Sequence, residues 1–163
     1  MQTRATIAVG TLLVVTVGCT TSPNGKLNAN KNRVPKFNEA TNAGEKEALK
    51  GIMTDDFTRY SAATASPSVS SREDIIRLQK VLLGSFPDQH VEFEKMVTDG
   101  DLVAVVATYS GTQTGTMGNF PATGKTPRSP FLAMFRIESG RSTERWVEWN
   151  NVSMLRQLNL FPP

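Results

Sequence analysis

Residues 109–158 read YSGTQTGTMGNFPATGKTPRSPFLAMFRIESGRSTERWVEWNNVSMLRQL, and this stretch decides the fold. Two extended runs, 131–138 and 142–150, are joined at Ser139-Gly140, a pair typical of a hairpin turn. A further strand over 102–112 is separated from them by the loop 113–129, which is rich in glycine and proline. The pattern predicts neighbouring antiparallel strands followed by a short helix over 152–158.

The residues before this stretch predict helices. Residues 33–57 favour a helical region broken at Gly44, and residues 71–84 favour an amphipathic helix with a capping box formed by Ser70 and Glu73. A strand is expected over 91–97. Helices first and strands afterwards indicate an α+β domain, in which a curved antiparallel sheet wraps round N-terminal helices. Such a sheet encloses a cone-shaped cavity, a common ligand site.

Composition narrows the range of functions. The 163 residues suit one domain, and 39% hydrophobic with 20% charged residues is ordinary for a globular protein. The net charge of +3 comes from scattered basic residues with no Lys/Arg run, which argues against a nucleic-acid partner.

The N-terminus carries features of an export signal. Arg4 precedes an apolar run over 7–17 that is too short to cross a bilayer, and small residues lead into Cys19, the only cysteine. The arrangement resembles the lipobox of bacterial lipoproteins. It implies a signal peptide over 1–18, a lipid-modified Cys19 that anchors the chain to the cell envelope, and the outer membrane as destination if the host has one. We expect a flexible tether over 19–32 and the folded domain over 33–163. The alternatives are a plain signal peptide with an incidental thiol, or an uncleaved anchor.

The last strand supplies the candidate site. Glu144, Trp146, Glu148 and Asn150 alternate, so they share one face of a strand, and we expect that face to line the cavity. A glutamate buried there would have a raised pKa suited to proton transfer, whereas Asn150 offers only hydrogen bonds.

Two alternatives stay open for these residues. Glu148 could instead pair with Arg136 or Arg145, or lie at the rim of the cavity. Tyr60 either adds a hydroxyl to the cavity or packs against it.

Other chemistries find little support. One cysteine and one histidine exclude Cys-His catalysis and clustered zinc ligands, and His90 reads as a capping or surface residue. Asp55 and Asp56 are adjacent, so their side chains diverge, and no metal site or cofactor is expected.

Several motifs together resemble one family. The chain is similar to the SnoaL-like polyketide cyclases, often labelled ester cyclases, which share the nuclear-transport-factor-2-like cone fold. The resemblance spans nearly all of the predicted domain. The motifs that carry it are residues 37–57, Phe86-Pro87-Asp88, Gly100-Asp101, SGTQTG (110–115), FPATGK (120–125), FRIESGR (135–141) and ERWVEWNNVSMLRQL (144–158).

The resemblance also implies where the chain departs from its family. In the cyclases an aspartate four positions after the tryptophan is the acid/base of an aldol closure, and here that position is Asn150. Members usually have a histidine where this chain has Tyr60, and a basic residue or histidine where it has Gln113. The resemblance therefore implies a catalytic position at Asn150 and ligand-binding positions at Tyr60 and Gln113. The strand pattern adds Glu148 as a catalytic candidate, and Trp146, Glu144 and Arg136 as ligand-binding candidates.

These departures favour binding over the family's reaction. The leading interpretation is a protein that binds a small hydrophobic or carbonyl-bearing molecule in an enclosed pocket. One alternative is an active cyclase-like enzyme that uses Glu148 as its acid/base. Another is a non-catalytic interaction module of the cell envelope, with homodimerisation through the sheet.

Overall fold

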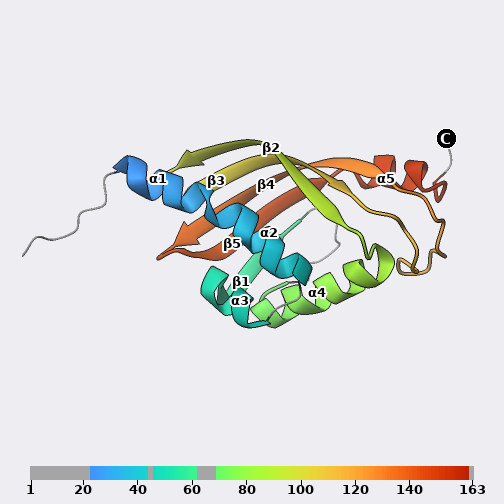
Figure 1. Cartoon of the computed structure of the whole chain (residues 1–163), viewed down its shortest axis with the longest axis horizontal. Coiled ribbons are helices and arrows are strands. Elements are labelled where there is room, and N and C mark those ends of the chain that lie inside the picture. Colours follow the sequence, from blue (N-terminus) through green and yellow to red (C-terminus); the bar gives the residue numbers. More distant parts are fainter. Residues whose placement is uncertain (1–22, 44–45, 62–68, 162–163) are drawn as a thin grey trace, which may run out of the picture.

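The computed structural model describes residues 23–43, 46–61 and 69–161 (Figure 1). The helices and strands, in chain order, are α1 (Pro23–Lys31), α2 (Arg33–Ala43), α3 (Lys46–Ile52), β1 (Met53–Tyr60), α4 (Arg72–Ser85), β2 (His90–Asp99), β3 (Leu102–Ser110), β4 (Arg128–Glu138), β5 (Arg141–Trp149) and α5 (Asn151–Gln157).

The five strands form one sheet in the order β1-β5-β4-β3-β2. Strands β2 to β5 pair antiparallel with one another, and β4 turns into β5 through Ser139 and Gly140, whose φ values of 49° and 77° suit a tight hairpin turn. The predicted α+β fold with a curved sheet and N-terminal helices is confirmed.

Strand β1 corrects the sequence-based prediction in one respect. Residues 53–57 were expected to be helical, but they form an edge strand that pairs parallel with β5. Met53 and Phe57 are both fully buried, and their i, i+4 spacing imitates the buried stripe of a helix. The pairing register of β1 shifts between Met53 and Thr58, and this irregularity lets the side chains of Met53 and Phe57 both reach the core from a strand.

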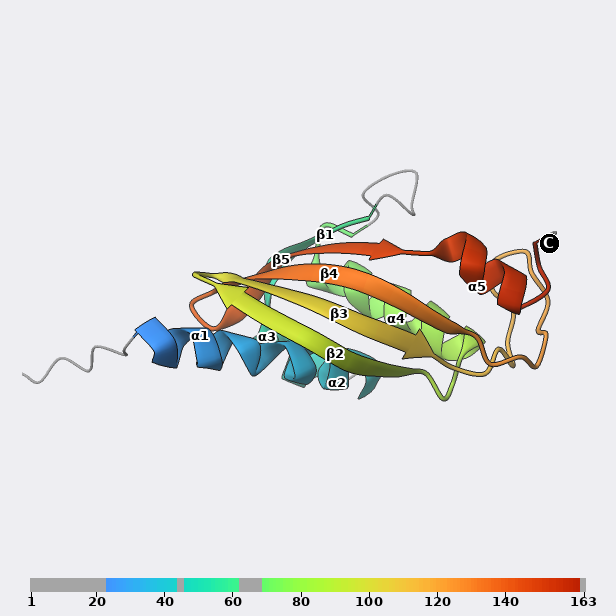
Figure 2. The same ribbon diagram turned by 90° about the horizontal axis from the view of Figure 1, so that it is seen from above.

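Helices α2, α3 and α4 lie on one side of the sheet, and Figure 2 shows the opposite side, which no described helix crosses. We call these sides the inner and the outer face. Phe37 of α2 packs at the centre of the inner side, with its ring centroid 5.2 Å from Phe135 and 5.6 Å from Phe57. The core therefore forms between α2 and the concave inner face.

The predicted tether over 19–32 is wrong for most of its length. Residues 23–31 form helix α1, in which Asn30 is buried and its Nδ2 donates a hydrogen bond to the carbonyl oxygen of Gly100 at 3.2 Å. The folded domain therefore begins before residue 33. Cys19 and the predicted signal peptide lie outside the described residues. No helix in the described part of the chain is both long and apolar enough to span a membrane.

The N-cap of helix α4 lies one residue later than predicted. Ser71, not Ser70, is the N-cap, and its hydroxyl accepts a hydrogen bond from the Asp74 N–H at 3.2 Å. The Asp74 carboxylate accepts one from the N–H of Ser70, the residue before the N-cap, at 3.2 Å, so the side chain reaches one residue further back than in a standard capping box.

Candidate ligand-binding site

The pairing of β4 with β5 decides which side chains face the cavity. Phe131 and Phe135 of β4 are buried on the inner face, and Trp149 and Arg145 are their partners on β5. Val147, the partner of buried Ala133, shares this inner face, so the alternate residues of β5 lie on the outer face. The alternating set was predicted to line the enclosed cavity, but the structure places Glu144, Trp146 and Glu148 on the side without helices.

The outer face joins Tyr60, Trp146, Glu144 and Arg136 in one cluster. The guanidinium of Arg136 donates to Glu144 at 2.6 Å and to Asp101 at 2.7 Å, and these two carboxylates raise the pKa of Arg136. The ring of Tyr60 stacks on Trp146 at 5.4 Å, and its hydroxyl donates to Glu144 at 3.3 Å. Sequence analysis thus identified residues that do meet, but on the surface opposite the enclosed cavity.

Asn150 and Glu148 also lie away from the inner face. Asn150 is exposed and is the N-cap of α5, where its Oδ1 accepts a hydrogen bond from the Ser153 N–H at 3.0 Å. Glu148 is exposed. Burial lowers the pKa of Arg59, and the charge of Glu148 offsets part of this effect.

Gln113 organises the loop between β3 and β4. It is fully buried, its Nε2 donates to the carbonyl oxygen of Pro121 at 3.2 Å, and its Oε1 accepts from the Thr123 hydroxyl at 2.7 Å. Its backbone also bonds to Gly124 and Lys125. Both ends of the Gln113 side chain are therefore engaged within the loop rather than turned toward a ligand.

A small, partly open cavity of about 40 Å³ lies between α2, α4 and the inner face of the sheet. We call it the arginine cavity, because two guanidinium groups line it. Its lining residues are Asn38, Asn42, Arg59, Ile75, Leu78, Gln79, Leu82, Gln89, Val91, Tyr109, Phe131, Arg145 and Trp149.

Amide side chains form a network in the arginine cavity. The Nε2 of Gln89 lies 3.2 Å from both the Oδ1 of Asn42 and the Oε1 of Gln79, and its Oε1 accepts from the Tyr109 hydroxyl at 3.3 Å. Burial, and then the charge of Asp88, raise the pKa of Tyr109, so this phenol stays neutral. These groups can form hydrogen bonds with a ligand, but none of them is a base that would take up its proton at neutral pH.

Arg145 and Arg59 are neighbours in the β1–β5 pairing, and both line the cavity. The guanidinium of Arg145 lies over the ring of Phe135, 5.1 Å from its centroid, and within 6 Å of the rings of Phe37 and Phe131. Burial, and then the charge of Arg59, lower the pKa of Arg145 to about 9, so the group is cationic at neutral pH. Its Nε is buried and has no hydrogen-bond partner.

Trp149 completes the apolar side of the cavity. Its ring stacks on Phe131 at 4.4 Å and meets Tyr109 edge-on at 5.5 Å. Sequence reasoning missed Arg145 and Trp149 because it chose the other face of the same strand. The apolar alternation of Phe131, Ala133 and Phe135 was the signal that could have found them, because cross-strand partners share a face.

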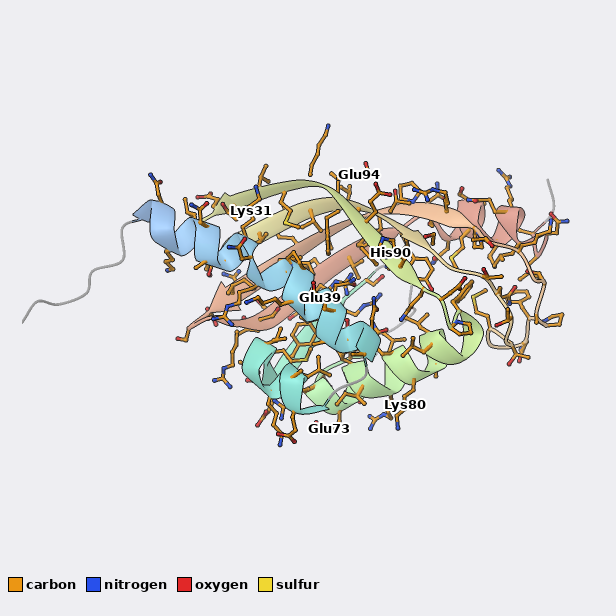
Figure 3. All side chains as sticks on the ribbon, in the orientation of Figure 1. Lys31, Glu39, Glu73, Lys80, His90 and Glu94 are labelled. Carbon is orange, nitrogen blue, oxygen red and sulfur yellow. The ribbon has the colours of Figure 1, made fainter. Side chains whose placement is uncertain are left out.

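The structure adds little to the other residues that were considered. His90 is exposed at the start of β2 (Figure 3). Asp55 forms an ion pair with Arg72. Among the described residues, His, Asp, Glu and Cys side chains do not gather in a group of three that could hold a metal ion.

Comparison with known proteins places this architecture. The family model described as SnoaL-like polyketide cyclase matches residues 32–158. The chain belongs to this family. The match therefore includes every helix and strand from α2 to α5. None of the curated proteins matches the sequence.

Solved structures agree with this assignment. IdmH from Streptomyces antibioticus, a candidate polyketide cyclase, is 27% identical with a TM-score of 0.70, over 80% of this chain and 98% of that one. A SnoaL-like candidate cyclase from Jannaschia sp. CCS1 is 22% identical with a TM-score of 0.74, over 90% and 100% of the two chains. AclR from Streptomyces galilaeus, a candidate hydroxylase, is 22% identical with a TM-score of 0.71, over 83% and 99%. The last two likenesses show the fold alone, and a shared fold does not fix a reaction.

Proposed function

We propose that this SnoaL-like protein binds a small carbonyl-bearing molecule in the arginine cavity. The observation that carries the proposal is the lining itself, where guanidinium and amide donors converge beside the aromatic rings of Trp149, Phe131 and Tyr109. A carbonyl oxygen accepts hydrogen bonds from such donors, while the flat body of the ligand packs on the rings. At about 40 Å³ the cavity has room for a small chemical group of the ligand. A larger ligand requires the side chains that line the cavity to move.

The lining favours binding over acid/base turnover. Among the described residues that line the cavity there is no aspartate, glutamate or histidine. Tyr109 has a raised pKa and the arginines are cationic, so no lining group exchanges protons readily at neutral pH. The alternative of a Glu148 acid/base requires a ligand on the outer face. Turnover that is lost in Glu148→Gln would establish that alternative.

Two tryptophans on one strand provide a matched test. Trp149 lines the cavity and Trp146 lies on the outer face, three residues away. Native mass spectrometry of the purified protein is expected to show a co-purifying small molecule, which Trp149→Leu loses and Trp146→Leu keeps. The reverse pattern would move the binding site to the outer face. A protein without any ligand under the mildest conditions would count against the proposal.

The outer face supports a second candidate function, a homodimer or envelope interaction module. Val97 is 67% exposed, Leu132 60% and Tyr60 38%, all on the face that no described helix covers (Figure 2). Exposed apolar side chains gathered on one face are typical of interaction sites. A second copy of the chain is the proposed partner. Sedimentation should show a dimer that Leu132→Glu dissociates, and a monomer at all concentrations would refute it.

We also propose that Cys19 is lipid-modified and holds the domain at the cell envelope. Support comes from the apolar run over 7–17 and the small residues before Cys19. Helix α1, which follows, starts at the opposite end of the molecule from α5 (Figure 1). Cys19→Ser should release the protein from the membrane fraction, and unchanged fractionation would contradict lipidation.

A further inference from the structure

Arg145 differs from the arginines that the chain pairs with carboxylates. Ion pairs join Arg72 to Asp55, Arg77 to Asp74, Arg128 to Glu92, and Arg136 to both Asp101 and Glu144. Within the described part of the chain, Arg145 has no such partner, and its nearest charged neighbour in the pairing of β1 with β5 is another arginine, Arg59.

This arrangement leaves the half-buried guanidinium of Arg145, with its buried Nε, without a carboxylate partner. A buried charge is costly unless it is paired and hydrogen-bonded, and a second cation beside it adds to that cost. The aromatic rings of Phe37, Phe131 and Phe135 compensate in part, since their faces attract a guanidinium. The rings do not accept a hydrogen bond from the Nε–H of Arg145, and no other described group of the protein does so. This unsatisfied donor suggests that a bound ligand supplies the acceptor.

We propose that the ligand of the arginine cavity is a planar carboxylate whose two oxygens accept hydrogen bonds from the guanidinium of Arg145. This inference rests on the proposed function of the cavity and names the class of its ligand. The planar fork of an arginine matches a carboxylate with two parallel bonds, and Nε with one terminal nitrogen forms such an edge. Arg59 adds a second positive charge, and the amides of Asn42 and Gln89 line the same space.

The shape of the cavity restricts the rest of the ligand. Trp149 and Phe131 are stacked, with an interplanar angle of 20°, and they present flat apolar surface beside the polar groups. An aromatic or conjugated acid would place its ring against this surface and its carboxylate on Arg145. A bulky saturated acid would find less contact there.

Isosteric probes test the charge separately from the shape. We would titrate the full chain, purified in a mild nonionic detergent, with benzoate and with neutral benzamide, and with acetate and acetamide. Benzoate is expected to bind at least about tenfold more tightly than benzamide, because hydrogen bonds to a charged group are roughly twice as strong as neutral ones. Acetate should exceed acetamide in the same sense.

Variants assign the preference to Arg145. Arg145→Met should weaken benzoate binding on the order of 10- to 100-fold and benzamide binding by clearly less, because benzamide loses only a hydrogen bond between neutral and charged groups and no ion pair, and Arg145→Lys should retain part of the preference. Arg128→Met removes an exposed arginine outside the cavity and serves as the control, with both affinities unchanged. Without ligand, Arg145→Met should melt at the same temperature as the original protein or higher, because an unpaired charge is removed.

Each result decides between the two proposals. Equal binding of benzoate and benzamide to the unaltered protein, or full benzoate binding by a folded Arg145→Met protein, would overturn the carboxylate inference and leave a neutral carbonyl ligand in place. If none of the four probes binds, the proposed function of the cavity fails, and the carboxylate inference fails with it.

Discussion

The cap at Asn150 gives a direct test of what this side chain does in the protein. The Oδ1 of Asn150 accepts a hydrogen bond from the Ser153 N–H at 3.0 Å and so satisfies a free donor in the first turn of α5. Loss of an N-cap side chain typically costs about 1 kcal/mol. For a domain of this length, about 1 kcal/mol corresponds to roughly 3–4 °C in melting temperature. Asn150→Ala should therefore lower the melting temperature by that amount.

Asn150→Asp should have the opposite sign. The carboxylate keeps the acceptor and adds a negative charge at the positive end of the helix, worth about 0.3–1 kcal/mol. A carboxylate favoured in this way has a pKa below its unfolded value of about 3.9. The gain is therefore present above that pH and is lost as the pH falls through the lower, folded-state pKa.

Thermal unfolding at pH 7 and at pH 3, followed by circular dichroism, measures both effects. Asn151→Ala is the matched control, because the exposed side chain of Asn151 makes no hydrogen bond among the described residues. Its melting temperature should stay within the range that corresponds to about 0.5 kcal/mol. An unchanged melting temperature in Asn150→Ala would refute the capping role. A loss of the co-purifying ligand in Asn150→Asp would place this residue at the binding site after all.

Three further predictions concern the loop and the ends of α4. Gly115→Ala should lower the free energy of unfolding in urea by about 2–4 kcal/mol, because a Cβ at this position would lie 2.0 Å from the carbonyl oxygen of Gly84. Gly84→Ala should instead raise it by about 0.5–1 kcal/mol, because Gly84 lies in helix α4 and a Cβ there meets no atom within 4 Å. Gln113→Leu should cost about 2–4 kcal/mol, because it strands the Pro121 carbonyl oxygen and the Thr123 hydroxyl, and equal stability would exclude a structural role. Hydrogen bonds from Thr112 lower the pKa of Asp88 below 3.8, so the contribution of this carboxylate to stability is present above that pH and is lost as the pH falls further. Asp88→Asn should flatten this part of the curve of stability against pH, and an unchanged curve would contradict the prediction.

Local patterns were sufficient to predict most of the fold. The strands β2 to β5 follow from runs of alternating residues, and their hairpin at Ser139-Gly140 follows from its turn chemistry. Helix α4 follows from its apolar stripe. These signals depend on neighbours in sequence, so one chain contains them in full. Strand β1 was missed because its buried residues, Met53 and Phe57, have the spacing of a helix.

The face of β5 that lines the cavity could not be predicted from this strand alone. One set of its alternating residues is Glu144, Trp146 and Glu148, and the other is Arg145, Val147 and Trp149. Both combine charge with aromatic surface, so neither reads as the plain core side. Only the pairing with β4 separates them, because its buried residues share a face with Arg145 and Trp149. The sequence thus identified the strand and missed its orientation by one residue.

Charge placement across β5 connects stability with binding. On the outer face, Arg136 is held by two carboxylates at a partly exposed site, where such pairs contribute little to folding but leave no charge unsatisfied. On the inner face, Arg145 lies beside Arg59 with an unsatisfied Nε–H, an arrangement that costs stability. Folding alone would be served better by an apolar side chain at position 145. The carboxylate that we propose would satisfy this N–H, and a ligand that binds only the folded state would also raise the stability of the fold as its concentration rises.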